Sequence, residues 1–192
     1  MKKIPFLALM LATACGREGP APKVLAVLPD FSMRAIAPKT EPSFGRKDML
    51  GSVWVVDFIF TRCAGPCPVL SQGMAGLSKE LPPELRLLSV TVDPEGDTPA
   101  VLREYAAAFG ARYPRWVFLR GSAEETQRLL YAGFKQSMSL DPKAPPPERV
   151  THSTRFVLVD RHGGIRGFYD GLSEPDNAAL ARDARRVLKA GL

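Results

Sequence analysis

Two cysteines four residues apart, Cys63 and Cys67, are the residues of this 192-residue chain best suited to chemistry. Pro66 and Pro68 fit only the first turn of a helix, so the pair should straddle a helix N-terminus. Residues at this spacing have Cα atoms about 6 Å apart, which allows a disulfide or two sulfurs on one metal ion. The helix N-terminus should lower the thiol pKa, which favours redox exchange and metal binding alike. An inert disulfide is the other possibility, but so small a loop would add little stability.

A third donor would distinguish metal binding from redox exchange, and the chain has two histidines that could supply it. Two thiolates with one imidazole form a soft site suited to Cu(I), whereas a redox dithiol needs no imidazole. His162 lies between Arg161 and Gly163 in a predicted hairpin turn, so we interpret it as a solvated residue. His152 comes just before a predicted core strand, where it can meet the tip of the first helix. We therefore predict that His152 is the third ligand.

Three aspartates and two methionines lie in or near these segments. Asp57, six positions before the first cysteine, is either a core residue with hydrogen bonds or a buried carboxyl of raised pKa that relays protons. Asp93 and Asp97 fit helix capping and loop shaping, and Asp93 could also support a copper site from behind its ligands. Met74 falls on the core stripe of a predicted helix, whereas Met138 could either pack or bind Cu(I).

The segments around these residues alternate strand and helix patterns, which predicts a layered α/β domain. A near-continuous apolar run at 53–60 is typical of a central strand buried on both faces. Its carboxyl end, where open α/β sheets place their sites, leads into the cysteine turn. The same patterns predict strands at 87–92 and 116–119, a hairpin at 155–160 and 165–169, and helices at 70–81, 98–109, 122–134 and 174–189.

The first fifteen residues have the pattern of an export signal. A positive start is followed by an apolar run that is too short to span a bilayer, and then by the small residues of a cleavage site, Ala12–Ala14. Because Leu11–Gly16 resembles a bacterial lipobox, Cys15 is predicted to be lipidated; plain cleavage after Ala14 is the alternative. Either route predicts an exported protein on the envelope side of a bacterial membrane, in the periplasm or at the outer surface, and lipidation would anchor it there.

The predicted organisation is an export signal with a lipobox at 1–15, a flexible Pro-containing tether at 16–27, and one domain at 28–192. The chain carries 26 Lys and Arg against 20 Asp and Glu, a net charge of +6. These positive residues are scattered rather than gathered into a stripe, and two of them belong to the signal. We therefore expect no nucleic-acid partner.

Three segments, taken in order, resemble the Sco/SenC family: DFIFTRCAGPCP at 57–68, VTVDPEGDTP at 90–99 and HSTRFVLVD at 152–160. The resemblance runs over nearly the whole predicted domain. The chain departs from the family's usual pattern in the residues between the two cysteines, Ala64–Pro66, which are bulkier or charged in most members. A Pro-rich loop at 141–149 also looks particular to this chain. Neither departure removes a predicted ligand.

This resemblance implies a thioredoxin-like fold, with a central mixed β-sheet flanked by helices. It also implies that Cys63, Cys67 and His152 bind copper, one ion per chain, as Cu(I) or Cu(II). The family assists assembly of the dinuclear copper centre of cytochrome c oxidase. The implied partner is therefore the copper-binding subunit of the oxidase or another copper-receiving protein.

Two functions fit these residues. The first is a copper chaperone that hands the metal to an oxidase subunit. The second is a thiol–disulfide reductase, an enzyme that keeps the copper-binding cysteines of a client reduced. Both would use Cys63 and Cys67, but only the first requires His152. A peroxiredoxin-like peroxidase is a weaker third candidate, because the Pro-x-x-x-Thr-x-x-Cys pattern does not surround Cys63.

Overall fold

The computed structural model describes residues 19–140, 143 and 150–192. Its centre is an eight-stranded sheet with strand order β1-β10-β9-β4-β5-β6-β2-β3. The three inner strands β4, β5 and β6 run parallel, and the other pairings are antiparallel, so the sheet is mixed. Its strands are Ala26–Val27 (β1), Ser32–Ala35 (β2), Ser43–Gly45 (β3), Trp54–Ile59 (β4), Arg86–Thr91 (β5), Trp116–Arg120 (β6), Arg155–Val159 (β9) and Gly164–Asp170 (β10).

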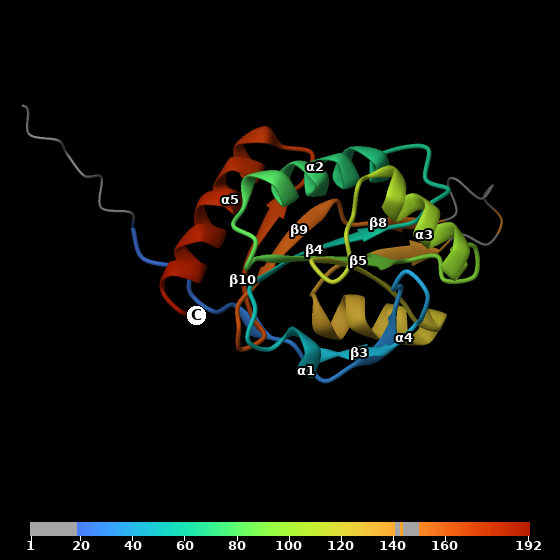
Figure 1. Ribbon diagram of the computed structural model, residues 1–192, viewed down its shortest axis with the longest axis horizontal. Coiled ribbons are helices and arrows are strands. Elements are labelled where there is room, and N and C mark those ends of the chain that lie inside the picture. The colour runs from blue at the N-terminus through green and yellow to red at the C-terminus, as the bar shows by residue number, and fades with distance from the viewer. Residues whose placement is uncertain (1–18, 141–142, 144–149) are drawn as a thin grey trace, which may run out of the picture.

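Helices cover both faces of this sheet. Figure 1 shows α2, α3 and α5 on one side and α4 on the other. The helices are Arg46–Met49 (α1), Cys67–Glu80 (α2), Pro99–Ala108 (α3), Ala123–Arg128 (α4), the π-helical turn Leu129–Gly133 (η1) and Glu174–Lys189 (α5). This arrangement confirms the predicted α/β fold with a mixed central sheet and flanking helices.

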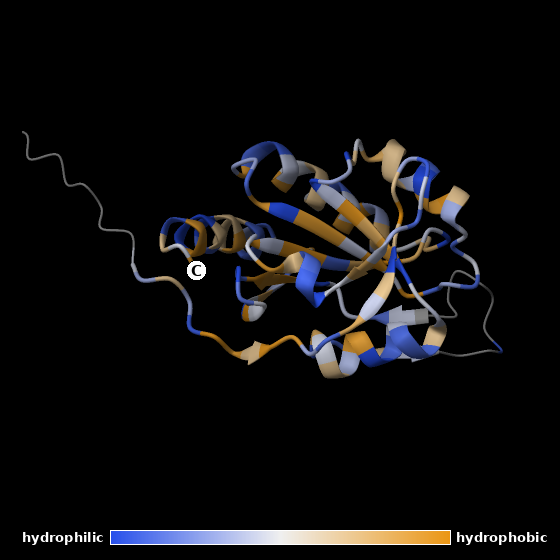
Figure 2. Ribbon diagram, turned by 60° about the horizontal axis from the view of Figure 1, so that its bottom comes forward, coloured by the Kyte–Doolittle hydropathy of each residue, from blue (hydrophilic) through white to orange (hydrophobic). Residues whose placement is uncertain are grey.

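The predicted elements form for the reasons that the sequence indicates. All six residues of β4 are buried, as its apolar run predicts. Thr98 caps α3 by accepting a hydrogen bond from the Val101 amide, and Ser122 forms a capping box with Glu125 at the start of α4. Figure 2 shows the result: apolar residues concentrate in the sheet, and polar residues cover the outward helix faces.

A second, two-stranded sheet joins Met138–Leu140 (β7) and Val150–His152 (β8) in antiparallel register. The backbone of Ser153 extends this pairing by donating a hydrogen bond to the carbonyl of Ser137. The sequence patterns did not predict this hairpin, because each strand has only three residues. It places His152 immediately before the core strand β9.

The N-terminal residues that the structure describes lie along the edge of the main sheet. β1 pairs with β10, and Arg166 donates a hydrogen bond to the carbonyl of Pro22. Ala26 and Val27 fall inside the range 16–27, for which we predicted a flexible tether, and they form a sheet strand. The export signal, Cys15 and nearly all of the loop 141–149 lie outside the described residues.

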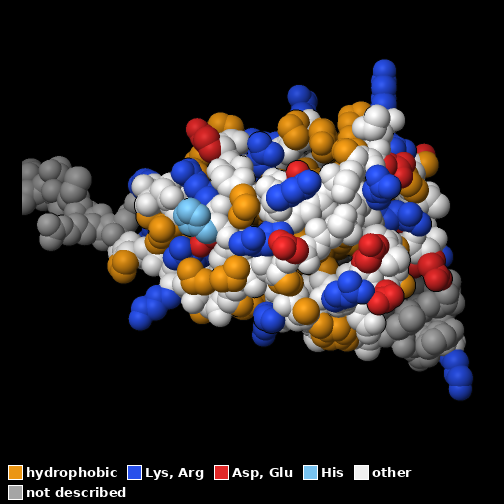
Figure 3. All heavy atoms as spheres, turned by 90° about the horizontal axis from the view of Figure 1, so that it is seen from below, with side chains coloured by type: hydrophobic (Ala, Val, Ile, Leu, Met, Phe, Trp, Pro, Cys, Tyr) orange, Lys and Arg blue, Asp and Glu red, His pale blue; other side chains and the backbone are white. Residues whose placement is uncertain are grey.

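The surface is mixed in charge. Figure 3 shows Lys and Arg side chains interspersed with Asp and Glu over the face seen from below. In the described part of the chain, no helix combines the length and the apolar character needed to cross a membrane.

Candidate metal centre

The two cysteines lie at the carboxyl end of β4, on opposite sides of a helix start. Cys63 is half-buried in the turn after β4, and Cys67 is the fully buried first residue of α2. Pro66 is the N-cap of α2 and Pro68 lies in its first turn, as predicted. Both thiols are free. The chain therefore presents a half-exposed and a buried thiol on one helical turn.

The predicted lowering of the thiol pKa is wrong for Cys67. Burial raises its pKa above the ordinary value, and a hydrogen bond with the Cys63 side chain raises it further. The helix dipole does not overcome this effect, because a fully buried thiolate loses its hydration. Pro68 also contributes no N–H to the helix start. Cys67 is therefore protonated at neutral pH when no cation is present to replace its proton.

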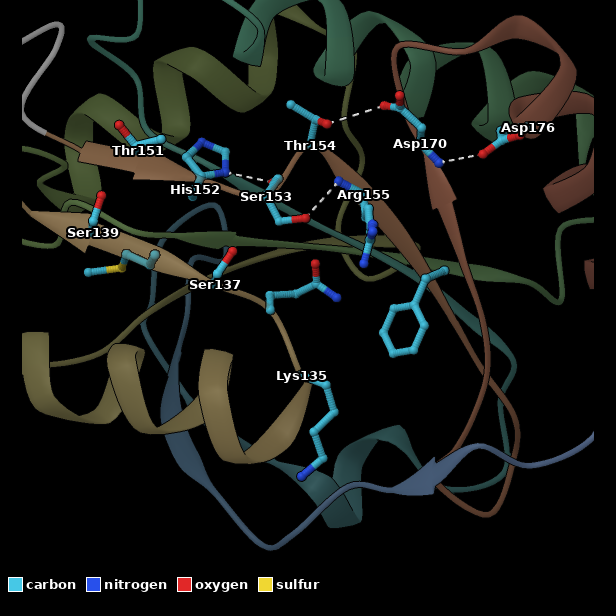
Figure 4. A pocket seen from close by; sticks show the side chains of 13 residues that line it. Lys135, Ser137, Ser139, Thr151, His152, Ser153, Thr154, Arg155, Asp170 and Asp176 are labelled. Carbon is cyan, nitrogen blue, oxygen red and sulfur yellow. Dashed lines mark hydrogen bonds between the residues drawn. The ribbon is translucent and has the colours of Figure 1, made fainter.

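His152 reaches the cysteines from the separate β7–β8 sheet. Its Nε2 lies 3.4 Å from the Sγ of Cys67, and its ring makes an edge-to-face contact with Phe60 at the end of β4. Its Nδ1 lies 2.9 Å from the carbonyl oxygen of Ser153 (Figure 4). Because a carbonyl can only accept, Nδ1 carries the proton and the Nε2 lone pair faces the sulfur. Burial lowers the His152 pKa, which keeps the ring neutral at pH 7.

The contact between Cys67 and His152 accounts for two of the three predicted ligands. Among the described residues, no three His, Cys, Asp or Glu side chains are gathered closely enough to hold a metal ion. Cys63 is the second thiol near this pair, since it contributes to the raised pKa of Cys67. The complete set of three ligands thus stays a prediction.

Asp57 lies beneath the cysteine turn, fully buried in β4. Burial raises its pKa from 3.8 to about 7. Ser89, its partner across β4 and β5, opposes this shift in part, although neither carboxyl oxygen has a partner within hydrogen-bonding geometry in the described structure. The Ser89 hydroxyl instead accepts a hydrogen bond of 2.9 Å from the Trp116 indole. Asp57 is therefore a buried acid whose pKa is near neutral, and its role as a proton relay stays a prediction.

Asp93 and Asp97 hold the loop that leads into the cysteine turn. The backbone amide and the hydroxyl of Thr61 both donate to the Asp97 carboxylate, at 3.1 and 2.6 Å, and the Thr91 hydroxyl donates to it as well. Asp93 pairs with Arg62, the residue directly before the first cysteine. Both residues thus shape the loop, as predicted, and the support of a copper site by Asp93 remains a prediction.

Sequence reasoning missed two hydroxyl groups behind the cysteines. Ser71, one turn after Cys67 on α2, is fully buried and lies 2.8 Å from the hydroxyl of Tyr105 on α3. Burial raises the pKa of Tyr105, and the charges of Asp57 and of both cysteines raise it further. The spacing of four residues from Cys67 to Ser71 could have indicated a shared helical face. Tyr105 could not be found in this way, because it belongs to the apolar stripe of another helix.

The remaining candidates separate clearly. His162 is exposed in the turn between β9 and β10, as predicted. Met74 is fully buried on the core face of α2. Met138 lies directly opposite His152 in the β7–β8 register, with its side chain partly buried against the core.

Comparison with known proteins shows which family has this arrangement. Residues 30–189 match the family described as SCO1/SenC. The SCO1 protein homolog of Bacillus subtilis is 34% identical over 143 residues, which cover 72% of this chain and 72% of that protein. Yeast Sco1 with copper bound is 26% identical, with a TM-score of 0.62, over 80% of this chain and 87% of that chain.

Two further solved structures agree over most of their length. A SCO1/SenC family lipoprotein from Bacillus anthracis is 31% identical, with a TM-score of 0.75, over 86% of this chain and 98% of that chain. BsSco, described as a member of the Sco family of cytochrome c oxidase assembly proteins with a disulfide switch, is 27% identical, with a TM-score of 0.73, over 88% of this chain and 98% of its own. The mixed sheet, the cysteine turn at the end of its central strand and these matches show that the chain belongs to the SCO1/SenC family.

Proposed function

We propose that this protein is a copper chaperone that holds one copper ion through Cys63, Cys67 and His152 and delivers it during assembly of the dinuclear copper centre of cytochrome c oxidase. The observation that carries the proposal is the 3.4 Å contact between the His152 Nε2 and the Cys67 Sγ. Thiol–disulfide exchange itself requires no imidazole, whereas copper binding by two thiolates gains its third donor from one.

The donor set fits copper on chemical grounds. Two thiols and a neutral imidazole are soft and borderline donors, which suit Cu(I) better than hard cations. The Ser153 carbonyl fixes the tautomer of His152, in the way that partners behind a metal ligand commonly orient it. The copper ion is cargo in this proposal, so its site must also open. The donors lie on separate elements, α2 with its preceding turn and the β7–β8 sheet. Cys63 and His152 are partly exposed, whereas Cys67 is buried, so a client would reach the first two.

The relatives support the cargo, the client and the location. Yeast Sco1 has been solved with copper bound, and BsSco is described as a cytochrome c oxidase assembly protein. The Bacillus anthracis relative is described as a lipoprotein, which supports export and lipidation at Cys15. We accordingly propose that the client is the copper-binding subunit of the oxidase or another copper-receiving protein. The encounter would take place on the envelope side of a bacterial membrane.

A thiol–disulfide reductase is the second candidate, because a partly exposed thiol and a buried thiol on one helical turn suit an attacking and a resolving cysteine. The half-exposed Cys63 would attack a client disulfide and release one client thiol. Cys67 would then attack the mixed disulfide, which releases the second client thiol and leaves Cys63 and Cys67 oxidised. An external thiol donor would restore the pair. The raised pKa of Cys67 slows its attack unless a base accepts its proton. The neutral His152, whose Nε2 lies 3.4 Å from the Cys67 Sγ, is the base in contact with this thiol, and Asp57 is a buried acid that could relay the proton.

Copper titration of the reduced protein tests the proposal. The full chain would carry Cys15→Ala, so that Cys63 and Cys67 are its two thiols, and His152→Ala would be compared with the exposed turn variant His162→Ala. We expect one copper per chain in the parent and in His162→Ala. We expect affinity in His152→Ala to fall by about a hundredfold, since even the partners behind a metal ligand are worth 10–100-fold.

Two results would count against this function. If His152→Ala binds copper as tightly as the parent, the three-ligand site is wrong and the reductase becomes the better reading. If the parent binds no copper but reduces a disulfide substrate catalytically in the presence of a thiol donor, the chaperone function fails.

A further inference from the structure

A methionine lies beside the candidate centre on the strand next to His152. Met138 of β7 and His152 of β8 are direct partners in the antiparallel register. Both line a cavity of about 890 Å³ that opens beside the β7–β8 sheet. Figure 4 shows His152 at this cavity with Ser137 and Ser139 on the facing strand. Met138 and His152 thus lie on two paired strands that both line one cavity.

The register decides which way Met138 faces. Residues directly opposite one another in an antiparallel pair share a face of the sheet, with Cβ atoms about 4.5–5.5 Å apart. On this face the His152 ring contacts Cys67 and Phe60, so the face is turned toward the cysteines. Met138 is itself partly buried against the hydrophobic core of the domain. Its flexible side chain can therefore bring a thioether to the side of His152.

Among the side chains that line this cavity, the Met138 sulfur is the group that prefers a soft cation to a hard one.

Resting on the copper function proposed above, we propose that the Sδ of Met138 is a further copper ligand, which joins His152 and the cysteine sulfurs when the bound ion is Cu(I). A thioether carries no charge and no proton, so it adds little to the binding of Cu(II). It favours Cu(I), and a methionine placed in this way tunes the reduction potential of a bound copper ion. Met138 would thus bias the centre toward carrying its cargo as Cu(I).

Met138→Leu separates ligation from packing, because leucine keeps nearly the same volume and removes the sulfur. Met49→Leu is the matched control, since Met49 is fully buried before the start of β4, at the opposite end of that strand from the cysteines. Cu(I) and Cu(II) would each be titrated anaerobically into the full chains in the Cys15→Ala background. Copper X-ray absorption of the Cu(I)-loaded proteins would count the sulfur ligands.

We expect Met138→Leu to bind Cu(I) about tenfold more weakly, to bind Cu(II) with a change of less than about twofold, and to lose one sulfur ligand. Met49→Leu should match the parent in all three respects. An unchanged ratio of Cu(I) to Cu(II) affinities together with an unchanged sulfur count would overturn the Met138 proposal. If Met138→Leu does not fold, the X-ray absorption of the Cu(I)-loaded parent is sufficient, because a count of only two sulfur ligands would overturn the Met138 proposal.

The same titrations separate this proposal from the function on which it rests. If His152→Ala binds copper more weakly and Met138→Leu binds it like the parent, only the Met138 proposal fails and the copper site stands. If the parent binds no copper, or if His152→Ala binds copper as tightly as the parent, the proposed copper site itself is wrong.

Discussion

At the scale of single residues, surroundings rather than residue type separate the candidates. The two histidines have the same side chain, yet His152 is held between the Ser153 carbonyl and the Cys67 sulfur, whereas His162 is exposed in a turn. The two cysteines differ in the same way, since one is half-buried and the other is fully buried. Burial acts in opposite directions on the neighbouring groups: it raises the pKa of Cys67 and lowers that of His152, so both are neutral when no metal is bound.

Asp57 gives the protein a pH-dependent stability. Its folded-state pKa of about 7 lies above its ordinary value of 3.8, so the folded protein holds a proton that the unfolded chain releases between these values. The favourable contribution of the neutral acid is complete below about pH 4 and is lost as the pH rises through about 7. Above that pH, the folded state contains a buried carboxylate without a hydrogen-bond partner among the described residues.

Asp57→Asn should therefore raise the melting temperature at pH 8 by about 5 °C and change it little at pH 4, because asparagine cannot ionise. Thermal unfolding followed by circular dichroism across this pH range measures the effect. Asp30→Asn is the control, since the Asp30 side chain is 95% exposed, and it should leave the profile unchanged. If Asp57→Asn destabilises the protein equally at both pH values, the effect comes from the introduced amide group and not from the ionisation of Asp57.

At the scale of elements, the cysteine helix α2 is positioned by close packing against its neighbours. Gly171, between β10 and α5, leaves no space for a side chain. A Cβ there would come within 2.4 Å of the Leu70 side chain on α2, 2.9 Å of the Thr154 carbonyl and 3.0 Å of the Phe156 ring. These three contacts join α2 to the segment that follows His152. The close approach of the chain at Gly171 thus sets the spacing between the two halves of the candidate centre.

Gly171→Ala should lower the free energy of unfolding by about 1–3 kcal/mol, because the added methyl group overpacks this junction. Gly76→Ala, on the exposed face of α2, is the opposite case, since its Cβ would meet nothing within 4 Å. This variant should stabilise the protein by about 0.5–1 kcal/mol through the better helix propensity of alanine. Urea denaturation compares the two. If Gly171→Ala unfolds at the same urea concentration as the parent, α2 can shift to make room for the methyl group without a loss of stability.

The elements also show what local patterns can and cannot predict. β4 and α5 were predicted to within a residue at each end, because a long apolar run and a long amphipathic stripe are strong signals. The last turn of the predicted helix at 122–134 is instead the π-helical turn η1. The β7–β8 hairpin, on which His152 lies, is too short for periodicity to reveal, since its strands are held by pairing with each other.

At the scale of the whole molecule, the N-terminal segment is attached to the sheet before it reaches the core. Arg166 donates to the carbonyl of Pro22 and pairs with Asp160 at 2.5 Å, with both charged side chains at least nine-tenths buried. β1 then closes the edge of the sheet beside β10. An anchor at Cys15 would therefore connect to the domain through residues that are already held against it.

Lipidation predicts where the protein is found. A Cys15→Ala variant expressed in a bacterium that processes lipoproteins should move from the membrane fraction to the soluble envelope fraction, because its acyl chains are the anchor. Fractionation followed by immunoblotting measures this, and a Cys63→Ala variant that stays in the membrane fraction is the control. Continued membrane attachment of Cys15→Ala would rule out the lipid anchor.

The sequence by itself determined the chemistry that is available: a pair of soft donors at a helix start, a histidine before a core strand and a buried acid in the central strand. It did so because apolar runs, helical stripes and proline positions are local signals of strands, helices and helix ends. Only the tertiary structure decided which of these groups meet. The Cys67–His152 contact and the Tyr105 hydroxyl behind the cysteines join segments far apart in the chain, and the Met138–His152 register depends on the pairing of two strands too short to predict. The rise in the Cys67 pKa was also a tertiary outcome, because desolvation depends on what packs around a group rather than on its neighbours in sequence.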